Sequence, residues 1–373
     1  MSKPSYDVVI AGAGIVGAAC AAELSEAGLR VAVVEPKMVG GGATAAGMGH
    51  LAVMDDSPDQ FALTRYSQLH WKALVPELPD DAEYLPCGSL WIAADDFEMA
   101  EVHRKFAYYR DRNVPVEVLD SQSLAQAEPN LRPGMAGALL MSDDSVVYSP
   151  NAARYLAEKA KRYGADFRLH QSLTSFTKNH AHLSNGTILN TEWILLANGT
   201  AAANLVAGLQ MQPRKGHLLI TDRYPGFVNH QLIELGYLKS AHSVSTDSVA
   251  FNVQPRRTGQ LLIGSSRQYG TDNPAVESAM LSKMLARAVE YMPNIGTLQS
   301  IRTWTGFRAA TPDKLPLIGP HPDFDHLYLA TGHEGLGIST SLATAKILAD
   351  QLLHRTPSIA FEPYLPARVM QHA

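Results

Sequence analysis

Cysteine is scarce in this chain of 373 residues, which contains only Cys20 and Cys87. At most one disulfide can form and none is expected, so we interpret the pair as reduced thiols of a cytoplasmic protein. No set of His, Cys and carboxylate residues has the spacing of metal ligands, and no metal is predicted.

Basic residues are too dispersed for a nucleic-acid surface. The 31 Lys and Arg and 36 Asp and Glu give a formal net charge of −5, without any dense basic block. Binding to a phosphate backbone requires such a surface, which argues against nucleic acid as a partner. The length allows two domains and a large core, and 46% hydrophobic with 18% charged residues is ordinary for a globular enzyme.

No uncharged stretch has the character of a membrane-spanning helix. The run 8–22 follows Lys3 as in a signal peptide, but its glycine spacing is explained by a nucleotide-binding turn. The run 193–211 contains Asn198 and Gly199, which indicate a strand, a turn and a helix. We expect a cytoplasmic protein that does not span the membrane.

The chain does contain a nucleotide-binding stretch from Asp7 to Glu35, DVVIAGAGIVGAACAAELSEAGLRVAVVE. Its pattern predicts a strand, a tight turn, a helix and a second strand. Gly12 permits the turn, Gly14 lets the backbone approach a pyrophosphate, and Gly17 lets helix and strand pack closely. Phosphate would sit at the helix N-terminus. The carboxylate of Glu35 can accept hydrogen bonds from ribose hydroxyls, which disfavours a cofactor with a 2′-phosphate.

Two further glycine-rich stretches follow. The segment 40–50, GGGATAAGMGH, has small residues that allow close approach to a flat ligand, although a flexible linker is the alternative. Near the C-terminus, a strand leads into a turn and then a helix from Ser339 to Leu353. The N-terminus of this helix could stabilise negative charge on a reduced ring system. Its turn contains Gly332, Gly335 and Gly337.

Short strands between these stretches indicate a second domain. They are expected at 88–93, 135–141, 216–221, 248–253 and 260–265, with a hairpin turn at Gly259. The predicted fold class is α/β: a Rossmann-like dinucleotide-binding domain with an inserted, mainly antiparallel β-sheet domain that also carries helices. We assign 1–80, 145–213 and 310–373 to the first domain, and 81–144 and 214–309 to a substrate-binding domain.

This order of features resembles the D-amino-acid oxidase family of FAD-dependent amine oxidoreductases, which includes glycine oxidase, sarcosine oxidase and D-amino-acid dehydrogenases. The likeness covers almost the whole chain. It is carried by VVIAGAGIVG with Glu35, GATAAGMGH, LLANGT, GFRAATPDKLPLIG and ATGHEGLGIS. Within the family, AAGMGHL and GHEGLGIS are most similar to the β-type subunits of D-hydroxyproline dehydrogenase and opine oxidase.

The resemblance implies an FAD cofactor that is not covalently bound, because Gly306 stands where sarcosine oxidases carry their flavin-linking cysteine. Glu35 would bind the adenosine ribose, and glycines of the first turn the pyrophosphate. The loop and the C-terminal turn would hold the flavin. The full set of cofactor-binding residues that the resemblance implies is Gly12, Gly14, Ile15, Val16, Gly17, Glu35, Thr44, Ala45, Gly47, Met48, Gly199, Gly332, Gly335, Leu336, Gly337 and Ile338.

The resemblance also implies a role for Arg308, and we hypothesise a second catalytic residue, His50, from its position and chemistry. Arg308 matches the arginine that pairs with the substrate carboxylate in glycine oxidase, and its forked donors suit a planar carboxylate. A structurally paired arginine is the alternative. The segment 40–50 is called the flavin loop below. His50, at its end, would lie near the substrate amine and help to keep the amine neutral; a histidine that only packs or forms structural hydrogen bonds is the alternative. Tyr148, Tyr237 and Trp304 are further residues that could shape the pocket.

The implied reaction is oxidation of a C–N bond by hydride transfer to flavin, which gives an imine. The substrate would be a small carboxylate-bearing amine, such as a cyclic or N-substituted D-amino acid, with D-hydroxyproline as the leading candidate. Glycine is less expected, because the second arginine of glycine oxidase is replaced here by Gly335. Relatives commonly pass electrons onward through companion subunits, so the protein could be peripheral to the inner membrane through an electron acceptor. An oxygen-using oxidase, or a flavin-binding subunit that needs a partner chain, is the alternative.

Overall fold

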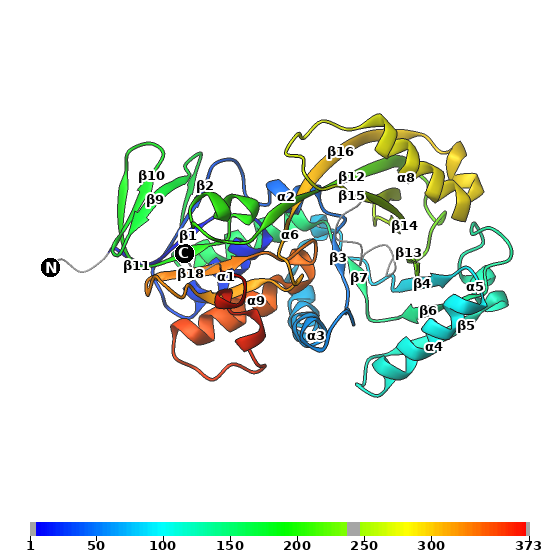
Figure 1. Ribbon diagram of the computed structural model, residues 1–373, viewed down its shortest axis with the longest axis horizontal. Helices are drawn as coiled ribbons and strands as arrows, with labels where there is room; N and C mark the ends of the chain where they lie inside the picture. The colour runs from blue at the N-terminus through cyan, green and yellow to red at the C-terminus, as the bar shows by residue number, and fades with distance from the viewer. Residues whose placement is uncertain (1–4, 237–246, 371–373) are drawn as a thin grey trace.

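The computed structural model describes residues 5–236 and 247–370. Within these ranges, two eight-stranded sheets build the two halves of an elongated molecule, and β12 and β16 extend from one half toward the other (Figure 1). The predicted α/β fold class, with an inserted and mainly antiparallel sheet, is confirmed. The domain boundaries predicted from the sequence stay a prediction.

The first sheet has the order β17-β18-β11-β1-β2-β8, with β9 and β10 attached to β11. The strands from β18 to β8 pair in parallel, and β17 runs antiparallel to β18. Their apolar runs are buried on both faces, as expected for a parallel sheet covered by helices. The strands are β1 (Tyr6–Ala11), β2 (Val31–Glu35), β8 (Asp166–Leu169), β9 (Leu173–Thr177), β10 (His180–Leu183), β11 (Ile188–Leu196), β17 (Leu317–Pro320) and β18 (Leu327–Thr331).

Helix α1 (Ile15–Glu26) lies at the centre of the first half. Its alanine-rich sequence is buried almost all round, because α6 (Ser149–Arg162) and α9 (Gly337–Leu352) pack against it. Small side chains let these helices approach closely over the sheet. Helix α3 (Pro58–Leu74) packs against α9 in turn. Cys20 is buried within α1, and both cysteines are free thiols.

The second sheet has the order β16-β12-β15-β14-β13-β4-β6-β5. All its pairs are antiparallel except β13 with β4. Helix α8 (Ser278–Tyr291) covers the central strands, and α4 (Asp96–Arg110) and α5 (Ser121–Ala127) pack at the far edge. The strands are β4 (Ser89–Ala93), β5 (Val116–Asp120), β6 (Gly137–Met141), β12 (Gln212–Arg223), β13 (Gln231–Glu234), β14 (Ser248–Pro255), β15 (Gln260–Arg267) and β16 (Ser300–Ala310).

The glycine-rich segment 40–50 is more ordered than the loop expected from its composition. It contains the short helix α2 (Gly42–Ala46) and leads into β3 (His50–Leu51), which pairs with β7 (Ser145–Val146). The run of Ala and Thr between glycines has enough helix propensity for one turn. In the ranges described, no helix combines the length and the apolar character that crossing a membrane requires, and no side-chain cluster suited to a metal ion occurs.

Candidate active site

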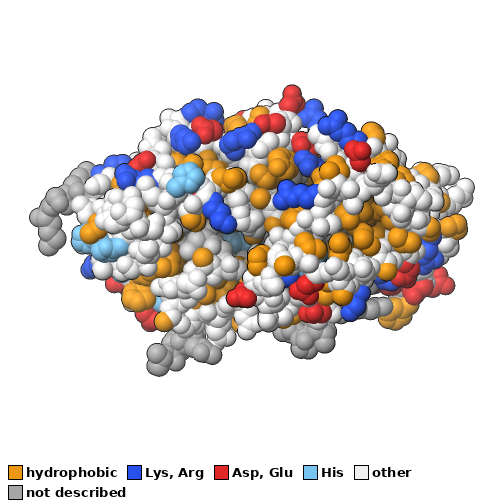
Figure 2. Space-filling model, turned by 90° about the horizontal axis from the view of Figure 1, so that it is seen from above, with side chains coloured by type: hydrophobic (Ala, Val, Ile, Leu, Met, Phe, Trp, Pro, Cys, Tyr) orange, Lys and Arg blue, Asp and Glu red, His pale blue; other side chains and the backbone are white. Residues whose placement is uncertain are grey.

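A cavity of about 1310 Å³ runs between the two halves of the molecule. It begins at the carboxyl ends of β1 and β2, passes α2 and the N-terminus of α9, and ends against the second sheet. Ligands of open α/β sheets bind at the carboxyl ends of the strands, so this position is the expected one. On the face seen from above, Lys and Arg side chains lie around the region where the two halves meet (Figure 2).

The turn between β1 and α1 has room only for glycine at two positions. A Cβ on Gly12, which has a φ of +101°, would lie 2.7 Å from the carbonyl oxygen of Ala197. A Cβ on Gly17 would lie 2.0 Å from the carbonyl oxygen of Gly12. Gly12 and Gly14 line the cavity, whereas Gly17 does not and serves the close packing of α1 on β1.

Two side chains hold the backbone of this turn in place through hydrogen bonds. The carboxylate of Glu35 accepts hydrogen bonds from the backbone N–H groups of Ala13 and Lys37, each at 2.9 Å. The hydroxyl of Thr44 accepts one from the N–H of Ile15 at 3.0 Å, which ties α2 to the start of α1. Ile15 and Val16 line the cavity beside them. The free backbone N–H groups at a helix N-terminus suit a pyrophosphate.

The carboxyl end of β11 supplies a further polar contact. Gly199 lines the cavity at a φ of +59°, next to Asn198. The side-chain oxygen of Asn198 is buried and has no hydrogen-bond partner among the described residues. A buried polar atom normally has a partner, so this site fits a bound polar group such as a dinucleotide.

The flavin loop around α2 differs in one detail from the sequence-based expectation. Thr44, Gly47 and Met48 line the main cavity, as does Ala46, but Ala45 is exposed and faces a smaller cleft instead. Successive residues of a helical turn point about 100° apart, which separates Ala45 from its neighbours. Ala46 therefore takes the place in the main cavity that was assigned to Ala45.

The N-terminus of α9 forms the opposite wall, where Gly332, Gly335, Leu336, Gly337 and Ile338 all line the cavity. The first turn of α9 contains no acidic residue that would neutralise its positive end. Two hydrogen bonds hold this end in place: the indole N–H of Trp71 donates to the carbonyl of Ile338 at 3.1 Å, and the hydroxyl of Ser339 donates to the carbonyl of His50 at 2.8 Å. The helix start and β3 are thus joined directly.

The imidazole of His50 faces the cavity, and its Nε2 is buried without a hydrogen-bond partner among the described residues. Burial lowers the pKa of His50 from 6.5 to about 4; a hydrogen bond with Gln254 opposes this effect and the positive charge of Arg308 adds to it. The ring is therefore neutral at physiological pH, and Nε2 is available to a ligand. His333 differs, because its Nε2 lies 3.0 Å from the hydroxyl oxygen of Thr344 in α9.

Arg308 reaches across the second sheet through a gap left by glycine. It lies on β16, and its Nη1 donates to the carbonyl oxygen of Ser266 on β15 at 3.1 Å. Between these strands runs β12, where a Cβ on Gly216 would lie 2.5 Å from Nη1 of Arg308. The absence of a side chain at Gly216 therefore permits the position of the guanidinium. Gly335 abuts the same side chain, since a Cβ there would lie 3.1 Å from Cδ of Arg308.

A buried ion pair that the sequence did not reveal also lines this end of the cavity. Arg214 of β12 contacts the carboxylate of Glu334, and their side chains are only 3% and 8% exposed. Arg214 also donates to the hydroxyl of Tyr269 at 3.2 Å. The N–H of Glu334 donates to the carbonyl of Ala309 at 3.0 Å, so the pair fastens the turn before α9 to the second sheet. Removing one partner of such a pair would be strongly destabilising.

The face of the second sheet supplies further residues that the sequence analysis did not single out. Polar residues alternate with apolar ones in strands such as FNVQ, 251–254, which reads as a solvent-facing pattern, but here the polar face meets the cavity. In β14 this alternation is the signal that could have found Asn252, whereas the other strands carry no such signal. The further residues are Trp91, Gln231, Ile233, Asn252, Ser265 and Arg267.

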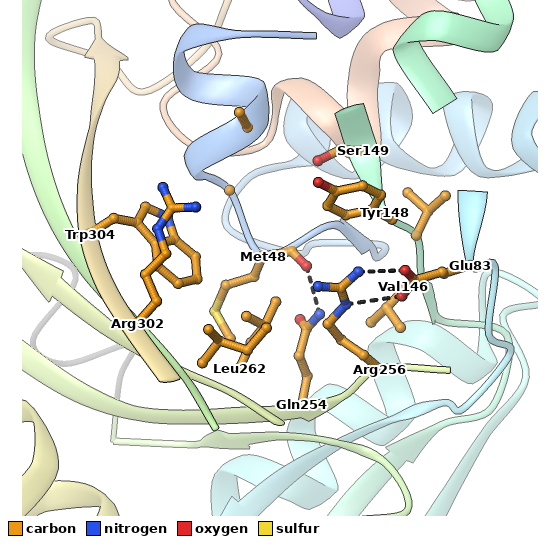
Figure 3. A pocket seen from close by; sticks show the side chains of 14 residues that line it. Met48, Glu83, Val146, Tyr148, Ser149, Gln254, Arg256, Leu262, Arg302 and Trp304 are labelled. Atoms are coloured by element: carbon orange, nitrogen blue, oxygen red, sulfur yellow. Dashed lines mark hydrogen bonds and ion pairs between the residues drawn. The ribbon is translucent and has the colours of Figure 1, made fainter. Parts of the chain in front are cut away.

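A second, smaller cleft lies on the other side of the flavin loop (Figure 3). Tyr148 and Trp304 line this cleft and not the main cavity, and Tyr237 lies outside the described residues. Gln254 donates to the carbonyl of Met48 at 2.6 Å, and the indole N–H of Trp304 donates to that of Ala46 at 3.4 Å. The cleft residues therefore support the flavin loop from behind.

This combination of a nucleotide-binding βαβ turn and a cavity that continues onto a separate sheet is the arrangement of a nucleotide-dependent oxidoreductase. Residues 7–351 match the family model described as DAO, FAD dependent oxidoreductase. The chain belongs to this family, and its cofactor is FAD.

Known proteins of this kind resemble the chain along its whole length. Glycine oxidase from Pseudomonas aeruginosa is 30% identical over 97% of this chain and 99% of its own. The crystal structure of glycine oxidase from Geobacillus kaustophilus has a TM-score of 0.87 at 26% identity, covering 100% of both chains. A hydrogen cyanide synthase subunit from Pseudomonas aeruginosa, HcnC, is 27% identical over 98% of this chain and 96% of its own.

The residues that line the cavity fit FAD. The cavity extends from Glu35 to Arg308, which accommodates an extended dinucleotide, and Gly12 and Gly14 line it at the N-terminus of α1, where a pyrophosphate would bind. At Gly306, where a cysteine would form a covalent link, an added Cβ would lie 2.3 Å from Cβ of Ala46. This position therefore supplies neither a thiol nor the space for one.

Proposed function

We propose that the protein oxidises the C–N bond of a small amino or imino acid, with D-hydroxyproline as the leading candidate substrate. The observation that carries the proposal is the convergence of Arg308 and His50 on the cavity end that faces the N-terminus of α9. When bound, FAD supplies the acceptor for the hydride that leaves the carbon bearing nitrogen, so that the C–N bond becomes C=N.

Arg308 would bind the substrate carboxylate through its forked N–H donors. This contact orients the small substrate, because the guanidinium is itself held against the carbonyl of Ser266. The neutral imidazole of His50 would accept a hydrogen bond from the amine, or take its proton, through the unpartnered Nε2. The walls of Trp91 and Ile233 would exclude water from the reacting carbon.

Reduction by substrate without oxygen tests this proposal directly. Purified protein with FAD is mixed anaerobically with a panel of D-amino and cyclic imino acids, and the visible flavin absorbance is followed. Bleaching by at least one carboxylate-bearing amine is expected, and the imine product is then trapped and identified. If no member of the panel reduces the flavin, even after addition of companion chains encoded beside it, the catalytic assignment is wrong.

We further propose a dehydrogenase that passes electrons onward through companion subunits. The specific observation in favour is that the similar HcnC protein is named as a subunit of a larger enzyme. An oxidase is the second candidate, because glycine oxidase from Pseudomonas aeruginosa, at 30% identity, is more similar to the chain than HcnC at 27%. Peroxide formation as fast as the reduction of an artificial dye would favour the oxidase.

The neutral state of His50 leads to a pH prediction. His50→Leu is expected to lower kcat/KM by roughly 10²-fold, because a general base or acceptor is lost. With a folded-state pKa near 4, His50 should add no ionisation between about pH 6 and 9, so wild type and variant should show the same pH profile at different heights. A wild-type inflection near pH 6.5 that the variant lacks would contradict the lowered pKa.

The lowered pKa of His50 also determines how the stability of the protein changes with pH. The folded-state pKa of His50 lies below its ordinary 6.5, so protonation favours the unfolded chain. This residue therefore makes the protein lose stability as pH falls from about 6.5 toward 4, and it has no such effect above that window. The leucine variant should lose less stability than wild type over the same acidic range in thermal melts of the apoprotein.

A further inference from the structure

Three side chains on the second sheet carry buried polar atoms without hydrogen-bond partners among the described residues. They are both amide atoms of Gln231, the side-chain oxygen of Asn252 and the hydroxyl of Ser265. These residues are 0%, 6% and 5% exposed, and all three line the main cavity. Buried polar groups nearly always have partners, and each one left unsatisfied is costly. The side chains of this polar cluster therefore require hydrogen-bond partners inside the cavity, which a polar group of a bound ligand would supply.

The three residues lie on neighbouring strands and share one side of the sheet. Asn252 of β14 pairs with Ile233 of β13 on one side and with Gly264 of β15 on the other. Ile233 in turn pairs with Trp91 of β4, and both of these apolar side chains line the cavity. Trp91 and Ile233 thus form an apolar wall beside the polar cluster. A ring methylene of the substrate would contact this wall.

The cluster also lies close to the arginine assigned to the substrate carboxylate. Nη1 of Arg308 contacts the carbonyl oxygen of Ser266 at 3.1 Å. Ser266 is flanked in sequence by Ser265 and Arg267, both of which line the cavity. A single small molecule can therefore touch Arg308 with its carboxylate and the polar cluster with a second group.

The chemistry of the cluster selects that second group. Two primary amides and a hydroxyl offer both donors and acceptors. A carboxylate accepts only and would leave the amide oxygens unsatisfied, and a methylene would satisfy none of them. A hydroxyl both donates and accepts, and the buried Arg267, which also lines the cavity, can add a further donor.

We propose that Gln231, Asn252 and Ser265 form a subsite for a hydroxyl group on the substrate, remote from its carboxylate. The inference rests on the proposed function and narrows it to hydroxylated amino or cyclic imino acids. A site built to bind a substrate hydroxyl discriminates strongly against the analogue that lacks it, because its own polar groups are then left unpaired. The subsite therefore determines specificity and does not take part in bond breaking.

The test compares 4-hydroxy-D-proline with D-proline in anaerobic flavin reduction by the FAD-loaded enzyme. Wild type is expected to prefer the hydroxylated acid by about 10²-fold or more in kcat/KM. Asn252→Leu and Ser265→Ala should each reduce this preference about tenfold or more, chiefly by lowering kcat/KM for the hydroxylated acid. The smaller serine substitution keeps the test valid if Asn252→Leu fails to fold.

Gln254→Leu is the matched control. Gln254 lies two residues from Asn252 on β14, but it lines the cleft behind the flavin loop and supports Met48. This variant should affect both acids equally. A second readout is binding of two unreactive ethers, tetrahydrofuran-2-carboxylate and its 4-hydroxy derivative, which is followed by the flavin spectrum. The hydroxyl should tighten binding in wild type and not in Asn252→Leu.

The outcomes separate this inference from the function on which it rests. If neither acid nor any other amine bleaches the flavin, the proposed function fails. If both acids bleach it with equal kcat/KM and the variants change nothing, the function stands and the hydroxyl subsite is wrong. A preference for a dicarboxylate that Arg267→Met abolishes would also overturn the hydroxyl assignment.

Discussion

Arg308→Met is expected to lower kcat/KM for the substrate by roughly 30- to 5,000-fold while FAD content stays unchanged. Truncating one partner of a buried, hydrogen-bonded charge pair costs about 2–5 kcal/mol, which corresponds to this range. Most of the loss should appear in KM, because the carboxylate is held equally in the ground and transition states. Anaerobic single-turnover reduction at a series of substrate concentrations separates the two parameters.

Arg302→Met is the matched control for this experiment. Arg302 lies on the same strand, but it lies over Trp304 and lines the smaller cleft behind the flavin loop. Arg302→Met should leave the KM for flavin reduction by the substrate unchanged. Equal effects of the two substitutions would show that Arg308 acts through the strand and not through the substrate carboxylate.

Gly216→Ala tests the same contact without removing the guanidinium. The new Cβ would lie 2.5 Å from Nη1 of Arg308, which is the mobile end of a long side chain, so the side chain is displaced while the strand keeps its place. We therefore expect a raised KM similar in kind to that of Arg308→Met and a melting temperature close to wild type. A wild-type KM would mean that Arg308 functions from a different position.

The sequence predicted those parts of the site that are local in the chain. The turn from Gly12 to Gly17 and the acid at Glu35 lie within one βαβ unit, so their spacing alone determines their arrangement. The turn before α9 is local in the same way. For this reason the α/β fold class and the FAD cofactor could be predicted, and both are confirmed.

The sequence did not predict which residues come together through pairing between distant strands. Gly216 matters only because β12 runs between β15 and β16, and this strand order is not written in local spacing. Asn252 was not singled out because alternation of polar and apolar residues does not distinguish a solvated strand face from one that lines a cavity, and Gln231 lies in a strand without such alternation. The sequence also did not predict the helical turn in the glycine-rich segment, and this turn directs Ala46 toward the main cavity and Ala45 toward the smaller cleft.

The two glycines of the first turn should fail in different ways when each is replaced by alanine. A Cβ at position 17 would lie 2.0 Å from the backbone oxygen of Gly12, so α1 and β1 must separate, and overpacking of this kind costs about 1–3 kcal/mol or more. Gly17→Ala should therefore unfold at a clearly lower temperature even without FAD. Thermal melts of the apoproteins measure this.

Gly14→Ala should instead fold normally and bind FAD poorly. Its Cβ would meet only the hydroxyl of Thr44, at 3.2 Å, and the φ of −64° at Gly14 is ordinary for alanine. Apoprotein stability should change by about 1 kcal/mol or less. FAD affinity, measured by titration of the apoprotein, should fall about tenfold or more, because the methyl group occupies space next to the pyrophosphate. Because the fold is retained, a normal affinity for FAD in Gly14→Ala would place the pyrophosphate away from this turn.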